Sequence, residues 1–356
     1  MILYKKGGYS LRNPYVISFG RIPTQYISRR VLISDIIDAL ESDIIEEQAY
    51  KLTGVRGTGK TVTLTEIEKK IRENDNWIVV GVKSNGNIIE DIIANLYSSV
   101  PFLTSFVDAN LNLTKFGIGL NLSNKSPVAS LDYALKTILR EVDRKGMRVL
   151  ITIDEARKTK HMVDFIQEFQ ILIREELPVF LIAAGLYEDV ESIENAEGLT
   201  FFLRAAKYEM TPLNHTFIRN DYEKTLNVSR EVAEKMATIT KGYAFAYQAL
   251  GKYMWDLNAQ DITEEVLALL DETLAEKVYR KIWSELAPRD KWFLEYIVKK
   301  DKMSATELLE MTNKKHNEWS EPRKRLTEKG IIDTKIRGQI IVCLPRLKEF
   351  VENETE

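Results

Sequence analysis

Two short motifs in this 356-residue chain combine residue types that bind phosphate and activate water. The first is Gly54-Val55-Arg56-Gly57-Thr58-Gly59-Lys60-Thr61, which fits the pattern G-x-x-x-x-G-K-[ST]. Its glycines let backbone N–H groups surround phosphate oxygens, and the helix that follows, with Val62 in its first turn, directs its positive end at them. We therefore predict a nucleotide-binding P-loop, in which Lys60 neutralises the β and γ phosphates and Thr61 ligates a metal ion.

The second motif is the acidic pair Asp154-Glu155, which ends the apolar run at residues 149–153. Asp154 suits the coordination shell of Mg²⁺, and Glu155 suits the orientation and deprotonation of an attacking water. The alternative is that the pair only opens a helix, where acidic residues are favoured by the dipole. Together with the P-loop it predicts binding of ATP or GTP with Mg²⁺, and hydrolysis rather than transfer to a hydroxyl. Because no N-K-x-D element follows, we expect adenine.

The composition sets limits on the class of protein. A chain of this length exceeds one ordinary core, so two or three domains are expected, and 44% apolar with 29% charged residues is typical of a soluble globular protein. The net charge of −3 leaves nucleic-acid binding to a local patch. One cysteine, Cys343, excludes an intramolecular disulfide. No stretch has the length and apolarity of a signal peptide or membrane span, so we expect a cytoplasmic protein without membrane contact.

The elements around the motifs predict an α/β domain. Short strands at residues 50–53, 77–82, 149–153 and 179–183 alternate with helical segments such as 62–71, 88–100 and 131–145. This alternation is typical of a parallel sheet with helices on both faces, a three-layer P-loop fold. Residues 111–122, with alternating apolar residues around two glycines, predict a small exposed β hairpin.

Beyond Pro212 the pattern becomes helical, and it changes again near the end. Residues 219–226, 230–240, 244–257 and 263–286 predict an all-helical lid. Helices at 290–299, 304–311 and 320–329, followed by strands at 331–333 and 339–344, outline a winged helix-turn-helix. Ser304 with Glu307 forms a capping box, and Gly330 ends the third helix. We expect four parts: a leader with the first helix (1–46), the P-loop domain (47–212), the lid (213–286) and the winged domain (287–356).

The winged domain contains a local excess of positive charge. Residues 314–337 hold eight basic and four acidic side chains, a balance of +4. Such a helix and wing suit contact with duplex phosphates. The candidate DNA-binding residues are Arg323, Lys324, Arg325, Lys329 and Arg337. The alternative is a protein-interaction module whose charges are only solvated.

In its order of motifs the chain resembles AAA+ ATPases of the origin-recognition-like class, the prokaryotic ATP-binding proteins with a C-terminal winged helix. The likeness runs nearly end to end. Besides the P-loop and the acidic pair it rests on these segments: Asn13-Pro14-Tyr15, Phe19-Gly20-Arg21-Ile22-Pro23, Arg29-Arg30, Ala184-Gly185-Leu186, Phe202-Leu203-Arg204, Met210-Thr211-Pro212-Leu213, Lys241-Gly242-Tyr243, Tyr247-Gln248 and Leu250-Gly251.

The resemblance implies a nucleotide held between the α/β domain and the helical lid, with Arg204 as a catalytic finger acting on a neighbouring copy in an assembly. The alternative for Arg204 is a surface ion pair with a nearby acid. Two departures from the family pattern predict slow hydrolysis. Ala183-Ala184 stand where many members carry a polar sensor, and residues 242–248 of the lid contain no arginine.

Three functions are compatible with these features. The first is an ATP-dependent switch that contacts DNA through its winged helix. The second is a DNA-binding protein of replication or mobile elements, in which ATP licenses loading on duplex. The third is a signalling or defence ATPase whose helical and winged domains hold a partner protein.

Overall fold

The computed structural model describes residues 12–18, 23–118, 130–300, 302–312 and 316–355. The chain divides into two compact units. One, the P-loop unit, consists of residues 29–55 and 60–210. The other, the helical unit, consists of residues 1–28, 56–59 and 211–356, so it takes in both the leader and the tip of the P-loop. The four-part division expected from the sequence is finer than this one and stays a prediction.

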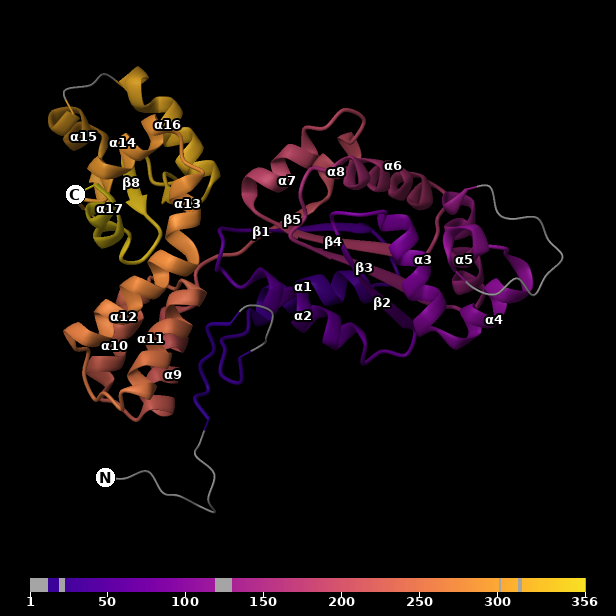
Figure 1. Ribbon diagram of the computed structural model, residues 1–356, viewed down its shortest axis with the longest axis horizontal. Helices are drawn as coiled ribbons and strands as arrows, with labels where there is room; N and C mark the ends of the chain where they lie inside the picture. The colour runs from indigo at the N-terminus through magenta and orange to yellow at the C-terminus, as the bar shows by residue number, and fades with distance from the viewer. Residues whose placement is uncertain (1–11, 19–22, 119–129, 301, 313–315, 356) are drawn as a thin grey trace, which may run out of the picture. The chain divides into compact units, whose positions relative to one another are not determined.

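The P-loop unit is built on a five-stranded parallel sheet in the order β2-β3-β4-β1-β5 (Figure 1). Four strands lie where the sequence predicts them, and the short edge strand β5 adds a fifth. The strands are β1 (Ala49–Thr53), β2 (Trp77–Lys83), β3 (Arg148–Asp154), β4 (Val179–Gly185) and β5 (Ala206–Glu209).

Helices cover both faces of this sheet, because neighbouring residues of each buried strand point to opposite sides. On one face Leu150 and Phe180 pack against α1 and α2, and on the other Val149 and Ile151 lie in the core formed with the remaining helices. The helices of the unit are α1 (Arg30–Glu41), α2 (Lys60–Ile71), α3 (Ile88–Ser99), α4 (Pro101–Asn110), α5 (Leu131–Arg144), α6 (Lys160–Arg174), α7 (Tyr187–Glu194) and α8 (Thr200–Arg204). The predicted three-layer α/β fold is confirmed.

The expected hairpin at 111–122 is wrong over its described part. Residues 114–116 form a 3₁₀ turn, and Leu111, Leu113 and Ile118 are buried in the core beside α4. The apolar alternation therefore reflects anchoring of a loop to the core rather than a strand with one wet face. Residues 119–122 lie outside the described residues.

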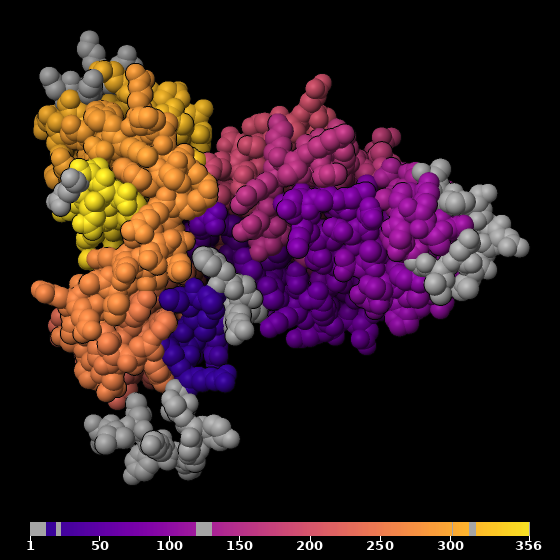
Figure 2. All heavy atoms as spheres, viewed as in Figure 1, coloured from indigo at the N-terminus to yellow at the C-terminus, as the bar shows by residue number. Residues whose placement is uncertain are grey.

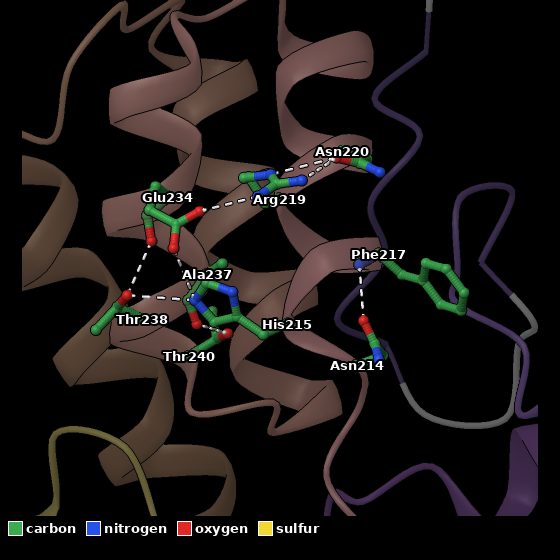
Figure 3. A network of polar contacts seen from close by, with 9 residues as sticks. All are labelled: Asn214, His215, Phe217, Arg219, Asn220, Glu234, Ala237, Thr238 and Thr240. Carbon is green, nitrogen blue, oxygen red and sulfur yellow. Dashed lines mark hydrogen bonds and ion pairs between the residues drawn. The ribbon is translucent and has the colours of Figure 1, made fainter.

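The first part of the helical unit forms the lid predicted by the sequence. Its helices are α9 (His215–Leu226), α10 (Arg230–Thr240), α11 (Ala244–Asp256), α12 (Glu264–Leu274), a π-helical turn at Ala275–Tyr279 and α13 (Arg280–Ser284). Asn214, Ser229 and Thr263 cap three of them through side-chain oxygens. Figure 3 shows Glu234 of α10 facing His215 and Arg219 of α9. The carboxylate oxygens of Glu234 lie 3.7 Å from His215 Nε2 and 3.5 Å from a guanidinium nitrogen of Arg219.

The leader belongs to this lid and not to the sheet. Tyr15 and Tyr247 both donate their hydroxyls to Asp221 of α9, at 2.8 and 2.7 Å. Gln248 accepts from the Val16 N–H and donates to the Gln25 carbonyl. Figure 2 shows the described part of the leader, in blue, against the orange lid helices. Tyr243, Phe245 and Tyr247 are buried, whereas Tyr253 and Trp255 are half-buried.

The last part of the chain has the order of a winged helix. Helices α14 (Pro288–Ile297), α15 (Ala305–Thr312) and α16 (His316–Glu328) accompany an antiparallel sheet of order β6-β8-β7. Its strands are β6 (Lys302–Ser304), β7 (Ile332–Asp333) and β8 (Gln339–Val342), and α17 (Leu347–Thr355) ends the chain. The capping box is confirmed, since Glu307 N–H donates to Ser304 Oγ at 3.1 Å and Ser304 N–H donates to Glu307 at 2.8 Å. Gly330 ends α16 with φ +68°.

Candidate nucleotide-binding and hydrolytic site

The P-loop and the acidic pair meet at the carboxyl end of the parallel sheet. Thr61 Oγ1, in the first turn of α2, donates to Asp154 Oδ2 at the end of β3 over 2.6 Å. Lys60 Nζ donates to the carbonyls of Gly54 and Val55, at 2.8 and 3.0 Å. The carboxyl end of an open parallel sheet is where ligands bind in α/β folds. The structure thus brings together Lys60, Thr61 and Asp154, three of the residues singled out in the sequence.

The tip of the P-loop has the backbone that a phosphate cradle needs. Gly57 and Gly59 have φ of +81° and +91°, values that favour glycine. A Cβ at Gly57 would also overlap the Tyr243 hydroxyl, which donates to the Arg56 carbonyl within the helical unit. The Phe245 N–H, in the first turn of α11, donates to the Gly57 carbonyl at 3.1 Å. The tip is therefore shaped both by its glycines and by its hydrogen bonds with Tyr243 and Phe245.

Glu155 occupies a strained backbone conformation. Its φ is +51°, in the left-handed region that non-glycine residues seldom adopt. Three hydrogen bonds hold the chain there: Glu155 N–H donates to Asp154 Oδ1, Ser84 Oγ donates to the Glu155 carbonyl, and Ala156 N–H donates to the Ala184 carbonyl, at 2.9, 2.9 and 2.8 Å. Backbone conformations of this kind are kept only where surrounding contacts hold them in place, and they are often found at active sites. With this conformation the chain leaves β3 directly after Asp154, and 70% of the Glu155 side chain is exposed.

A cation adjoins the Glu155 carboxylate. Arg157 extends its guanidinium between Glu155 and Asp189 of α7, with nitrogen–oxygen distances of 3.8 Å to each. Sequence reasoning missed Arg157 and Ser84. Arg157 stands two residues after the acidic pair, so its position alone could have identified it, whereas nothing in the sequence connects Ser84 to Glu155.

The end of β4 is apolar, as the sequence indicates. Ala183 and Ala184 are fully buried between β1 and β3 and offer no polar side chain. Arg204, at the last position of α8, is exposed, and within the described residues its side chain forms no hydrogen bond or ion pair. The alternative of a surface ion pair for Arg204 is therefore not observed in the part of the chain that the structure describes.

The candidate DNA-binding residues divide into different environments. Arg325 is bound to the buried Asp290 of α14, its Nε 3.0 Å from both carboxylate oxygens, and this hydrogen bonding raises the pKa of Arg325. Lys324 pairs with Glu328 at 3.6 Å. Burial lowers the pKa of Lys329. Arg323 is half-buried and Arg337 exposed. Lys314 and Lys315, which contribute to the predicted positive excess, lie outside the described residues, as do residues 19–22 of the leader.

Comparisons with known proteins agree with this geometry. The Walker-type ATPase PABY2304 of Pyrococcus abyssi aligns at 14% identity over 91% of this chain and 95% of that one, with a TM-score of 0.60. The Aeropyrum pernix ORC2 protein, solved as ADPNP–ADP complexes, aligns at 15% identity over 95% and 96%, with a TM-score of 0.54. The chain thus has the fold of the origin-recognition-like AAA+ ATPases, as the resemblance implied.

Sequence comparisons add one local match. Residues 276–351 match a family described as a domain of unknown function, DUF8462. This match runs from the π-helical turn at Ala275–Tyr279 into α17. No curated protein matches the chain by sequence. Within the described residues, no helix combines the length and apolarity that crossing a membrane requires.

Proposed function

We propose that this protein is an ATP-dependent switch of the AAA+ type, which binds ATP at its P-loop, hydrolyses it slowly and contacts duplex DNA through its winged helix. The observation that carries the proposal is the 2.6 Å bond between Thr61 and Asp154, which joins the two motifs at one edge of the sheet. A phosphate loop and an acidic strand end in contact are the parts that nucleotide hydrolysis requires. The TM-scores of 0.60 and 0.54 to ATPase-fold structures support it.

The residues present fit a magnesium ion. The Thr61 hydroxyl and the Asp154 carboxylate are hard oxygen ligands within 2.6 Å of each other, and Mg²⁺ prefers one or two such protein ligands together with substrate phosphates. When bound, the ion would neutralise charge on the phosphates. We assign Thr61 and Asp154 to hold it.

Hydrolysis would depend on the remaining residues as follows. Backbone N–H groups of residues 56–62 and the Lys60 ammonium hold the triphosphate. Glu155 accepts a proton from water while the water oxygen bonds to the γ phosphorus, and the bond from that phosphorus to the bridging oxygen of ADP breaks. The apolar end of β4 supplies no polar group to this step, so we expect slow turnover.

Coupling to DNA follows from differential affinity. ATP shifts an equilibrium between arrangements of the protein only as far as it binds one of them better than the other. We expect the nucleotide-bound arrangement to differ in its affinity for duplex. The test measures ATP hydrolysis with and without duplex DNA for the wild type and Glu155→Gln. Stimulation that disappears in the variant supports a DNA-coupled ATPase, while hydrolysis that survives in Glu155→Gln contradicts the assignment of the base.

A second candidate is supported by a different observation, the surface of the winged domain. Arg325 is engaged with Asp290, which removes one of the predicted phosphate contacts. Leu309, Met311 and Ile336 are 45%, 40% and 51% exposed. Exposed apolar side chains are typical of contacts between proteins rather than of contacts to phosphate. The alternative is therefore a signalling or defence ATPase whose winged domain holds a partner protein, and the salt dependence of binding separates the two.

A further inference from the structure

A second side-chain hydrogen bond joins helix α2 to strand β3. Thr152 Oγ1 of β3 donates to Glu68 Oε1 of α2 over 2.6 Å. Thr152 is 2% exposed, and the other residues at 149–153 are apolar. Apolar side chains are the usual occupants of such a strand, and burying a hydroxyl is costly unless it is hydrogen-bonded. The threonine therefore has a specific partner on the helix, and that partner is a carboxylate.

This bond lies on the same faces of the two elements as the bond from Thr61 to Asp154. Thr61 and Glu68 stand seven positions apart, about two turns of helix, so both lie on one face of α2. Thr152 and Asp154 stand two positions apart, so both lie on one side of β3. Each bond is 2.6 Å long. The helix is thus held to the strand at two points, and only one of them consists of the proposed metal ligands.

Glu68 is also linked to the neighbouring strand. Its second carboxylate oxygen, Oε2, accepts from Arg72 one turn later at 3.2 Å, and the same guanidinium donates to the Val79 carbonyl of β2 at 3.4 Å. Gly81 of β2 pairs with Thr152 in the sheet register. A Cβ at Gly81 would lie 3.5 Å from Thr152 Oγ1 and 3.9 Å from Glu68 Oε1, so the glycine leaves the bond uncrowded. The carboxylate therefore connects α2, β3 and β2 at one place.

Stability accounts for this arrangement only in part. The Glu68 side chain is 17% exposed, so its carboxylate is largely removed from water. Replacing both partners of a hydrogen bond by apolar groups of the same shape can leave the stability of a protein nearly unchanged. What an apolar pair does not reproduce is the fixed length and direction of the hydrogen bond. The bond therefore serves the spacing between helix and strand.

The spacing of α2 and β3 decides where the two proposed magnesium ligands stand. Thr61 is carried by the helix and Asp154 by the strand, so a shift of one element displaces one oxygen relative to the other. Mg²⁺ demands near-ideal octahedral geometry with short bonds, so it tolerates little displacement. We propose that Glu68 and Thr152 are positioning residues, whose hydrogen bond keeps α2 and β3 at the spacing that magnesium with ATP requires. This inference rests on the function proposed above.

The first test measures ATP affinity twice, in excess EDTA and in saturating Mg²⁺, by titration with a fluorescent ATP analogue. The ratio of the two affinities reports how strongly metal and nucleotide binding are coupled on the protein. The double variant Glu68→Met with Thr152→Val removes both partners of the bond. We expect its affinity in Mg²⁺ to fall about tenfold or more, the range usual for groups that orient metal ligands. Its affinity in EDTA and its unfolding midpoint should stay close to those of the wild type.

Single variants separate the hydrogen bond from the size of the side chains. Thr152→Val removes the hydroxyl at nearly constant volume and should lower the ratio as the double variant does, whereas Thr152→Ser keeps a donor and should retain it. Glu68→Gln keeps an acceptor oxygen and should retain the ratio too. Thr137→Val, which removes an exposed hydroxyl bonded to the Tyr133 carbonyl on α5, is the control for loss of a threonine hydroxyl and should behave as wild type.

A change of background shows whether the pair acts through Thr61. Thr61→Ala removes the ligand on the helix, so adding the double variant to it should cause little further loss of the ratio. In hydrolysis, raising the Mg²⁺ concentration should restore most of kcat to the double variant, because Lys60 and Glu155 are unchanged. A loss caused by a damaged fold would instead persist at every Mg²⁺ concentration and would appear in EDTA as well.

Each contrary result has a distinct meaning. A double variant with the wild-type ratio overturns the role of Glu68 and Thr152 and leaves the ATPase intact. Equal losses in EDTA and in Mg²⁺, a Thr152→Ser variant as impaired as Thr152→Val, or a full further loss on the Thr61→Ala background also overturn the inference. A wild type whose ATP affinity does not change with Mg²⁺ overturns the proposed metal ligands, and with them this inference. A wild type that binds no ATP overturns the proposed function itself.

Discussion

Thr61 Oγ1 donates a hydrogen bond to Asp154 Oδ2 over 2.6 Å, although 93 positions separate the two residues in the chain. Thr61 lies in the first turn of α2, the helix after the P-loop, and Asp154 ends β3, which β4 separates from β1 in the sheet order. The contact arises because α2 begins at the carboxyl end of β1, at the same edge where β3 ends. This is the geometric basis for assigning nucleotide chemistry to the site.

Lys60→Ala should strongly weaken ATP binding, because the phosphates lose the positive charge at the start of the helix that follows the P-loop. We expect a loss of affinity of about 100-fold or more, roughly 3 kcal/mol, since several charged phosphate oxygens share this contact. Titration of a fluorescent ATP analogue measures it. Lys69→Ala, an exposed lysine on the same helix, is the control. Tight binding retained by Lys60→Ala would remove the assignment of the phosphate site.

Glu155→Gln should bind ATP as tightly as the wild type but hydrolyse it at least about 100-fold more slowly, the range usual for loss of a general base. The amide keeps the size of the side chain and cannot accept the proton. Single-turnover hydrolysis beside equilibrium ATP binding separates the two effects. An equal loss of binding and hydrolysis would mean that Glu155 supports the fold of the site rather than the chemistry.

Arg325→Met should destabilise the helical unit more than Asp290→Asn does. The arginine variant leaves the buried Asp290 carboxylate without its partner, whereas the asparagine variant leaves a guanidinium whose side chain is 36% exposed and can reach water. We expect a loss of about 3 kcal/mol in the first case and less in the second. Urea unfolding measures both, with Arg323→Met as control. Equal losses would show that the buried Asp290 carboxylate left without its partner is not the cause of the destabilisation.

Lowering the pH should reduce the stability of the folded C-terminal part of the chain, because Glu307 becomes protonated. Hydrogen bonds from Lys300 and from the Ser304 N–H and hydroxyl lower the pKa of Glu307 from 4.5 to about 2. A carboxylate with a depressed pKa stabilises the folded state above pH 4.5, and this contribution is lost as the pH falls towards 2. The difference in unfolding midpoint between the wild type and Glu307→Gln should therefore be largest at pH 6 and shrink at pH 3. Glu310→Gln, an exposed neighbour on α15, should show no such trend.

Duplex binding should fall steeply with salt if the winged helix contacts phosphates. Arg323→Ala with Lys324→Ala should weaken binding uniformly across sequences and reduce the slope of log affinity against log salt by about two, one for each lost contact. Arg337→Ala tests the wing in the same way. Fluorescence anisotropy between low and physiological salt measures the slope. Binding insensitive to salt, together with loss of a partner on changing Ile336, would favour the protein-docking alternative.

The sequence by itself determined the parts with short, residue-specific geometry. The P-loop pattern depends on glycines at fixed spacing. The strands β1, β3 and β4 are buried along almost their whole length, and β2 is a short run rich in valine, so these elements were predicted from local residues. The capping box Ser304–Glu307 was likewise predictable, because both hydrogen bonds join residues three apart.

Only the tertiary structure decided the relations between distant segments. The edge strand β5 has four residues of alternating burial and depends on β1 for its hydrogen bonds, so its own sequence gives a weak signal. The engagement of Arg325 with Asp290, the support of Glu155 by Ser84 and the bond from Thr152 to Glu68 each join residues 35 or more apart. Charge counting along the chain cannot detect such contacts, because a side chain's role depends on which group the fold places beside it.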